Sequence, residues 1–480
     1  MPTSPDLDQL SQTELIGLVR NLIRRIEKLE LENTTLKAEN TRLKNENSRL
    51  QSELEKLKRQ QARSATPFSR NQPKPHPQPP GRKKGLGVFK YRQRPEASDV
   101  SEIVEVPAPE TCPECQTSTT PIRIALAWVT DLPEIKPVIT EYRFEVSACP
   151  TCGMTLRGEH PLIPNSQRGA SAHRFGPRIL ALTSALRFDF GVTSRRVPEM
   201  MLEFFNLRLT HSALVQSAIT NANESQVIGA QYVKLRTQVR HASVVNTDDT
   251  SWALHGRNAF LMAFKTNSSV VYQIREQHRT IEVLELIPAG FNGVLVADRF
   301  GTYDAKALGN VKHQKCVAHL LKNLKLILEK RKRGRSHVFA LALRAVFKQS
   351  LRLHSRFVTG GIEESVFKRQ GRVLTRRLDR LLEFRELKDK DNARLLGEFS
   401  KHHARGSLLR FLEDPSVSPT NNAAERALRP AVIARKLSAG SKNERGALAF
   451  AAFKSVIETG KLFGVSGFGT LLEAYSHPRR

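Results

Sequence analysis

Leucine recurs every seven residues through the N-terminal part of the chain. An apolar repeat of this period predicts a long α-helix that buries one stripe against a partner helix, because supercoiling keeps that stripe on one face. If leucine takes position d of the heptad, then Asn33, Asn40 and Asn47 fall at position a. A buried asparagine at a favours a parallel, two-stranded coiled coil, which we expect over residues 12–60. The expected dimerisation contacts are the d residues Leu15, Leu22, Leu29, Leu36, Leu43, Leu50 and Leu57.

The charges that flank the leucine stripe favour self-association. Position g of one helix faces the next e position of its partner, and the charged pairs there have opposite signs. A lone solvated helix is the alternative, but it would not need leucines held in register over so many heptads. The pairs are Arg25–Glu30, Glu32–Lys37, Glu39–Lys44 and Glu53–Lys58.

The whole chain is strongly basic. Its 480 residues, enough for two to four domains, include 76 Lys and Arg against 47 Asp and Glu, a formal net charge of +29. This excess favours a polyanionic partner, and nucleic acid is the first candidate. An anionic membrane is the rival, but the sequence has neither a spanning apolar run nor a signal peptide. We therefore expect a cytoplasmic, nucleoid-associated protein that binds DNA and no membrane.

Residues 61–99 differ in composition from the expected coiled coil. They are rich in proline and basic residues, and no acid occurs before residue 96. Such a segment predicts a semi-rigid linker, and its charge also suits contact with phosphates. The prolines are Pro73, Pro75, Pro77, Pro79 and Pro80.

Two CxxC pairs lie in the segment 100–165, and strand-like sequence separates them. In a reducing compartment such pairs are typical of metal ligands, and four thiolates make a tetrahedral zinc site. Because four cysteines leave no open position, the zinc is expected to be structural. A redox role for one pair is the weaker alternative. The expected zinc ligands are Cys112, Cys115, Cys149 and Cys152.

Residues 170–240 have a helical pattern, with breaks near Gly191 and Asn206. Two helices joined by a brief turn are expected within residues 196–222. They could form a helix-turn-helix that reads DNA or a plain helical packing module, and the sequence favours neither.

From residue 241 the pattern changes to strands. We expect strands over 243–254, 258–266 and 269–275, a helix over 280–287 and a buried strand over 293–301. A later helix, with Thr420 or Asn421 as its cap, carries Glu425. This order is that of an RNase H-like α/β core, expected over 241–475. The complete chain is thus predicted to be a multidomain α+β protein.

The acids of this core suit phosphodiester chemistry. In-line displacement requires an activated nucleophile and a stabilised leaving oxygen, which two divalent ions can provide. Carboxylates are the ligands that magnesium and manganese prefer. We therefore expect Asp248, Asp298 and Glu425 to be catalytic and to bind Mg²⁺ or Mn²⁺. Asp249 is an alternative to Asp248, since neighbours on a strand face opposite ways. Asp304 is a weaker alternative to Asp298.

Basic residues gather between and beside these acids. The stretch 312–412 is helical and basic, and we expect an insertion that lies along DNA, although a helical bundle with a solvated face is the alternative. Cys316 and His319 within it are expected to be packing residues, because two groups do not close a metal site. The expected DNA contacts are Lys330, Arg331, Lys332 and Arg333 in the insertion and Arg426, Arg429, Arg435 and Lys436 beside Glu425.

The order of these motifs resembles the insertion sequence 66 family of bacterial transposases over nearly the whole chain. TDDT at 247–250, ADRFGTYD at 297–304 and CVAH at 316–319 resemble the family's first acid, second acid and Cys-x-x-His motifs. NNAAERALRP at 421–430, followed by ARKLSAGS, resembles the glutamate motif. Two departures are Asp249, where glutamate is usual, and Arg299-Phe300, where Gly-Tyr is common.

The resemblance implies a DDE transposase. Such an enzyme would cleave DNA at transposon ends and transfer the strand into target DNA, using Asp248, Asp298 and Glu425. It also implies accessory proteins of the same element as partners. A catalytically inactive DNA-binding regulator or relic is the alternative, because the zipper, zinc segment and basic helices suffice for binding. A nuclease sharing the core is a third possibility.

Overall fold

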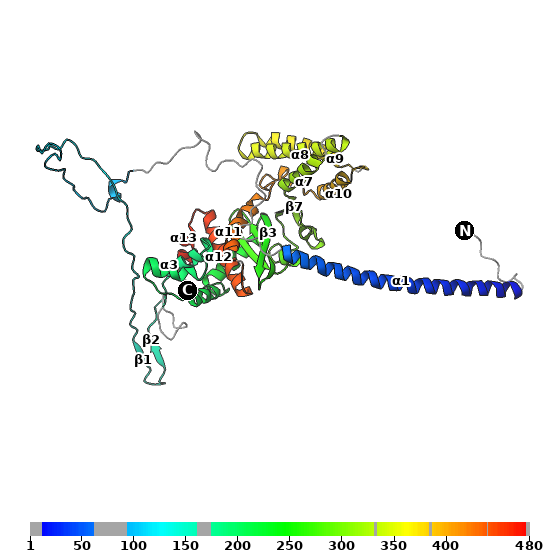
Figure 1. The fold of residues 1–480 in the computed structure, drawn as a ribbon, viewed down its shortest axis with the longest axis horizontal. Helices are drawn as coiled ribbons and strands as arrows, with labels where there is room; N and C mark the ends of the chain where they lie inside the picture. Colours follow the sequence, from blue (N-terminus) through cyan, green and yellow to red (C-terminus); the bar gives the residue numbers. More distant parts are fainter. Residues whose placement is uncertain are drawn as a thin grey trace. The chain divides into compact units, whose positions relative to one another are not determined.

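The heptad region forms one uninterrupted helix, α1 (Gln12–Gln61), in the computed structural model (Figure 1). The structure describes residues 12–61, 94–160, 174–330, 334–383, 386–438 and 440–476. Helix α1 belongs to a unit separate from the rest of the chain. Five of its heptad leucines, from Leu22 to Leu50, are between 51% and 63% exposed, so the apolar stripe is open along the helix.

The cysteine-rich segment contains two turns with the same hydrogen bonds. The amide of Cys112 donates to the carbonyl of Thr117, and Cys149 donates in the same way to Met154. Each cysteine carbonyl then accepts from the amide four residues on. A hairpin of β1 (Val146–Ala148) and β2 (Thr155–Arg157) flanks the second turn. Each CxxC pair therefore lies in a knuckle that presents two thiols.

A five-stranded mixed sheet forms the centre of the remaining chain, in the order β5-β4-β3-β6-β7. Strand β3 runs antiparallel to β4 and parallel to β6, and β6 runs parallel to β7. Four of these strands were predicted from their apolar residues. The strands are β3 (Val244–Leu254), β4 (Arg257–Lys265), β5 (Val270–Arg275), β6 (Val294–Ala297) and β7 (Lys312–Lys315), with helix α6 (Thr280–Leu284) between β5 and β6.

Most of the helices before the sheet share one hydrophobic core with it. Buried side chains from this segment, such as Ala181, Ile228 and Tyr232, belong to the same cluster as Trp252 and Phe264 of the sheet. The predicted division at residue 240 is therefore a change from helix to strand within one core. The helices are α2 (Pro177–Ser184), continued by a π-helix (Ala185–Asp189), α3 (Arg196–Phe205), α4 (His211–Asn221) and α5 (Val227–Arg240).

Two C-terminal helices complete this core. Helix α12 (Glu444–Leu462) packs on β5 and α5, and α13 (Gly467–Ser476) packs on α2. Figure 1 shows α12 beside α11 (Asn422–Ser438), which packs on β3 and β4. None of the described helices is both long enough and apolar enough to cross a membrane.

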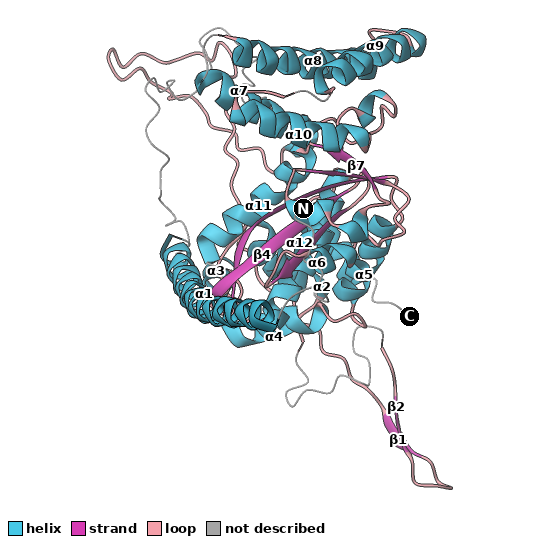
Figure 2. Ribbon diagram, turned by 90° about the vertical axis from the view of Figure 1, so that its right-hand side faces the viewer, coloured by secondary structure: helices cyan, strands magenta, loops and turns pink. Residues whose placement is uncertain are grey.

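The predicted insertion forms a second hydrophobic cluster on the other face of β6. Side chains alternate along a strand, so Val294 and Val296 enter this cluster while Leu295 and Ala297 enter the first. Figure 2 shows the insertion helices gathered at the β7 edge of the sheet. They are α7 (Val317–Lys330), α8 (Arg335–Val358), α9 (Glu364–Leu382) and α10 (Lys390–Ala404).

The first residues of the predicted insertion, 312–315, are strand β7 and belong to the sheet. The sequence KHQK has no apolar signal, yet His313, Gln314 and Lys315 are buried. Gln314 satisfies its amide by donating to the Leu408 carbonyl at 3.0 Å and accepting from the Phe411 amide at 3.3 Å. Side-chain hydrogen bonds therefore replace apolar packing at this edge.

Because His313 is buried, we expect the free energy of unfolding to depend on pH. Burial, followed by the charge of Lys315, lowers the pKa of His313 to about 4. In the unfolded chain the pKa is about 6.5, so the unfolded state binds more protons between these values and stability falls as pH falls. From pH 7 to pH 5 we expect a loss of about 2 kcal/mol from this group. Urea unfolding followed by tryptophan fluorescence measures it in wild type and in His313→Gln.

The variant should lose about 2 kcal/mol less than wild type over this pH interval. The matched control is His255→Asn, at an exposed turn position with positive φ, which should behave as wild type. Equal acid sensitivity of His313→Gln and wild type would show that His313 is not the group responsible.

Candidate active site

Parallel pairing of β3 and β6 places two of the predicted acids side by side. The last registered pair is Asn246 with Val296. Asp248 lies two residues further along β3, and Asp298 lies two residues beyond Val296, directly after the end of β6, so the pairing brings them to the same level of the sheet. The Phe300 amide donates to Oδ1 of Asp298 at 2.8 Å and orients that carboxylate.

Contacts from the preceding loop position helix α11 and, with it, Glu425. The side-chain amide of Asn421 donates to the Thr247 carbonyl of β3 at 2.6 Å. Asn421 directly precedes α11, at the predicted cap position, but its Oδ1 accepts no hydrogen bond within the described residues, so its side chain does not cap the helix. Its backbone carbonyl accepts from the Glu425 amide at 3.1 Å, in the first turn of α11. A carboxylate is favoured there, because helix N-termini carry partial positive charge.

The acids are close enough to influence one another. Burial and the negative charge of Asp249 raise the pKa of Asp248 to about 7, and the charges of Asp298 and Glu425 contribute to the same rise. Like charges crowded in this way favour the neutral acid unless a cation is present. The oxygens of Asp248, Asp298 and Glu425 do not all lie within 4.8 Å of one another.

The two alternative acids have partners of their own. Asp249 lies 3.3 Å from Nδ1 of His278, whose side chain is almost fully buried. Asp304 pairs with the buried ammonium of Lys315 at 2.9 Å. Lys315 also donates to the backbone carbonyl of Asp298 at 3.3 Å. Asp304 therefore supports the segment that carries Asp298, and Asp249 remains at the groove described next.

An open groove of about 390 Å³ runs along α11 beside these acids. Its lining includes Asp248, Asp249 and Glu425 together with Arg429. Arg426, Arg429 and Lys436 are exposed on the same helix. Their cationic side chains therefore lie on the helix that also carries Glu425 and borders the groove.

Arg435 of α11 differs from these residues. Its guanidinium donates to Oγ1 of Thr250 at 3.2 Å and to Oγ of Ser251 at 2.5 Å. It therefore ties α11 to β3, which the sequence did not indicate. In the insertion, Lys330 is exposed and lies 3.8 Å from Asp391. The remaining predicted contacts, residues 331–333, lie outside the described residues.

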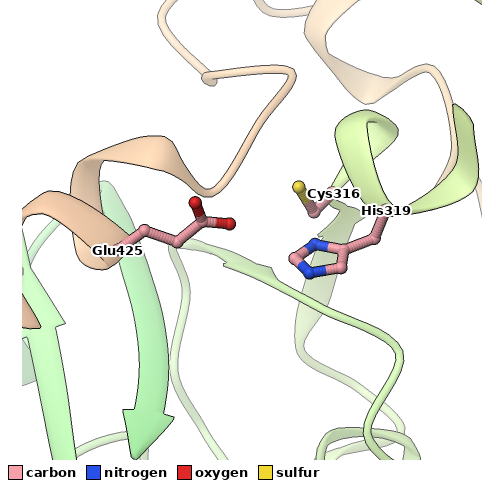
Figure 3. A group of neighbouring side chains, drawn as sticks. All are labelled: Cys316, His319 and Glu425. Carbon is pink, nitrogen blue, oxygen red and sulfur yellow. The ribbon is translucent and has the colours of Figure 1, made fainter. Parts of the chain in front are cut away.

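Cys316 and His319 lie beside Glu425 (Figure 3). The three ligand atoms, one from each side chain, are within 4.8 Å of one another. Sequence spacing showed that Cys316 and His319 share a helical turn, but nothing in it indicated that a glutamate more than a hundred residues away would join them. The prediction that they are packing residues was therefore made without Glu425, the third residue of the group.

Each cysteine knuckle fits a zinc site locally. Gln116 and Gly153 adopt positive φ at the same place in the two knuckles, which turns the chain back after each CxxC pair. The thiols of one knuckle do not group with those of the other within ligand distance. Hydrogen bonds from Thr117 lower the pKa of Cys115 to about 7, which favours the thiolate that zinc requires.

Comparison with known families agrees with this arrangement. The family described as Transposase IS66 family matches residues 172–449, more than half of the chain. The zinc-finger binding domain of transposase IS66 matches residues 109–153, which include all four knuckle cysteines and support a structural zinc there. Among curated proteins, none matches the chain. On the family match, the chain belongs to the IS66 family of transposases.

Proposed function

We propose that this transposase is a metal-dependent DDE enzyme that cleaves DNA at transposon ends and transfers the strand to target DNA. The observation that carries the proposal is the convergence of Asp248, Asp298 and Glu425 from β3, β6 and α11, expressed in the raised pKa of Asp248. Carboxylates gathered at the cost of mutual repulsion suit a cationic ligand.

The order of the strands supports an RNase H-like core. Three antiparallel neighbours, β5, β4 and β3, are followed by parallel β6 and β7. The first acid lies on the central strand and the second directly after its parallel neighbour. Glu425 comes from a helix packed on β3. This is the arrangement that the sequence order led us to expect for such a core.

The donor set fits magnesium or manganese, because carboxylate oxygens are the ligands these hard cations prefer. Bound ions would supply the charge that activates an attacking oxygen and stabilises a leaving one. Asp248, Asp298 and Glu425 would hold them. Water would attack the scissile phosphorus, and the bond to the leaving 3′ oxygen would break. The freed 3′-hydroxyl would attack target DNA in a second displacement, with no covalent protein intermediate.

Basic and apolar surfaces outside the acid site would bind DNA and pair the chains. Arg426, Arg429 and Lys436 would hold DNA phosphates near the acids. The segment containing α3 and α4, together with the zinc segment, would recognise the terminal repeats. The open leucine stripe of α1 would pair two chains into a homodimer. Accessory proteins of the same element are proposed as further partners.

Replacing any of the three acids should abolish chemistry and spare binding. Asp248→Asn, Asp298→Asn and Glu425→Gln should each reduce strand cleavage and joining at least about a hundredfold, since a metal ligand supplies several kcal/mol. The assay uses DNA bearing the element's own ends with magnesium or manganese. Glu444→Gln is the matched control, an exposed glutamate in the first turn of α12.

Retained cleavage in one acid variant would refute the role of that residue. Metal-dependent joining by wild type alone would support the DDE mechanism. If wild type binds the ends without cutting, even with the element's accessory proteins present, the inactive regulator becomes the better description.

Two arginines of α11 should respond differently to substitution. Arg429→Gln should leave stability unchanged and reduce the slope of log affinity against log salt by about one, as expected for one lost phosphate contact. Arg435→Gln should lower the free energy of unfolding by roughly 1–2 kcal/mol, because its bonds to Thr250 and Ser251 are lost. Urea unfolding and fluorescence anisotropy at several salt concentrations separate the two effects. The reverse pattern would contradict both assignments.

A charge at the leucine stripe of α1 should prevent dimerisation. Leu36→Glu places a carboxylate at position d, where it would be buried against the partner helix. The mass measured by light scattering should fall by half relative to wild type. Leu31→Glu is the matched control, because Leu31 lies at the outward position f and is 70% exposed. An unchanged mass for Leu36→Glu would show that α1 does not pair the chains.

A further inference from the structure

Cys316, His319 and Glu425 bring three different ligand types into one small space (Figure 3). Their ligand atoms are sulfur, imidazole nitrogen and carboxylate oxygen, all within 4.8 Å of one another. Within the part of the chain that the structure describes, no other group of three or more such side chains meets this distance.

The backbone holds these ligands in place from two sides. Cys316 directly precedes α7 and His319 lies in its first turn, so the spacing of three residues puts both on one helix face. The Cys316 amide donates to the Ala297 carbonyl at 2.9 Å, and the Val317 amide donates to Pro419 at 3.0 Å. Glu425 faces them from the first turn of α11.

Asn421 connects the two sides. Its backbone amide donates to Sγ of Cys316 at 3.2 Å, and its carbonyl accepts from the Glu425 amide. The side chain of Cys316 is fully buried. The Nδ1 atom of His319 is also buried, and it makes no hydrogen bond within the described residues. A buried imidazole nitrogen without such a bond can donate its lone pair to a metal ion.

The donor set is wrong for magnesium and right for zinc. Thiolate and imidazole select zinc and its spectroscopic substitute cobalt, whereas magnesium prefers oxygen ligands throughout. Zinc bonds of about 2.0–2.3 Å place ligand atoms roughly 3–4 Å apart, so a small rotation of the glutamate side chain completes the set. Three protein ligands leave a fourth position open.

We propose that Cys316, His319 and Glu425 form a second zinc site, distinct from the four-cysteine segment. A consequence rests on the proposed function: the site shares Glu425 with the acid triad. The Glu425 carboxylate turned toward Cys316 and His319 is withdrawn from Asp248 and Asp298. Zinc at this position is therefore an inhibitor of magnesium-dependent cleavage, and excess magnesium relieves the inhibition.

Cobalt binding tests the site without reference to DNA. Full-length protein, with zinc already in the four-cysteine segment, is titrated with Co²⁺ alone. Wild type should bind one further cobalt and show a sulfur-to-cobalt charge-transfer band. Cys316→Ser should lose this band, and His319→Gln and Glu425→Gln should weaken cobalt binding at least about tenfold. Glu444→Gln should match wild type.

Absence of the band in wild type, or its persistence in Cys316→Ser, would overturn the proposal. If Cys316→Ser fails to fold, as judged by circular dichroism, His319→Gln provides the test. The charge-transfer band of His319→Gln should then appear only at higher cobalt concentration than that of wild type. A cobalt affinity equal to that of wild type would refute the site.

A second measurement separates this proposal from the proposed function. Zinc is added to wild-type cleavage reactions at several magnesium concentrations, at zinc levels that displace the bound cobalt. Inhibition that magnesium relieves supports the shared role of Glu425, and unaffected cleavage overturns it. Cobalt binding without cleavage under any condition upholds the site and refutes the DDE function. Cleavage without cobalt binding upholds the DDE function and refutes the second zinc site.

Discussion

The buried amide of Asn421 connects the three parts of the chain that form the candidate site. Its side-chain amide donates to the Thr247 carbonyl of β3, and its backbone amide donates to Sγ of Cys316, just before α7. Its backbone carbonyl accepts from the Glu425 amide in the first turn of α11. The residue is completely buried, so loss of the bond from its side-chain amide to Thr247 would cost about 1–3 kcal/mol. This cost explains why one polar residue can set the position of Glu425 relative to the acids of the sheet.

A second set of polar contacts joins the basic insertion to the same acids. Lys315 bridges Asp304 and the backbone of Asp298, while Arg299 pairs with Glu398 of α10. The insertion helices also share a hydrophobic cluster with one face of β6. Contacts made by these helices with DNA would thus bear directly on the strand that positions Asp298. The pairing of Arg299 also explains how a residue unusual for the family at this position is accommodated.

Much of the fold could be predicted from local patterns, and the exceptions have physical reasons. The strand that contains Asp248 and the strand that ends directly before Asp298 were predicted because their residues are largely apolar. Strand β7 was not, because its buried residues are polar and depend on partners around residues 407–411. The bonds of Arg435 to β3 were not predicted for a similar reason, because no residue near Arg435 in the sequence indicates that its guanidinium reaches Ser251.

The sequence by itself determined the helical heptads, the two CxxC pairs and four of the five strands of the sheet, and it indicated the acids that we propose as metal ligands. These are properties of neighbouring residues, since periodicity and spacing act over one or two turns of chain. Only the tertiary structure decided that Asp248 and Glu425 border one groove, that Asp304 pairs with Lys315, and that Glu425 lies beside Cys316 and His319. Contacts between residues more than a hundred positions apart arise from strand pairing and core packing, so patterns among neighbouring residues do not predict them.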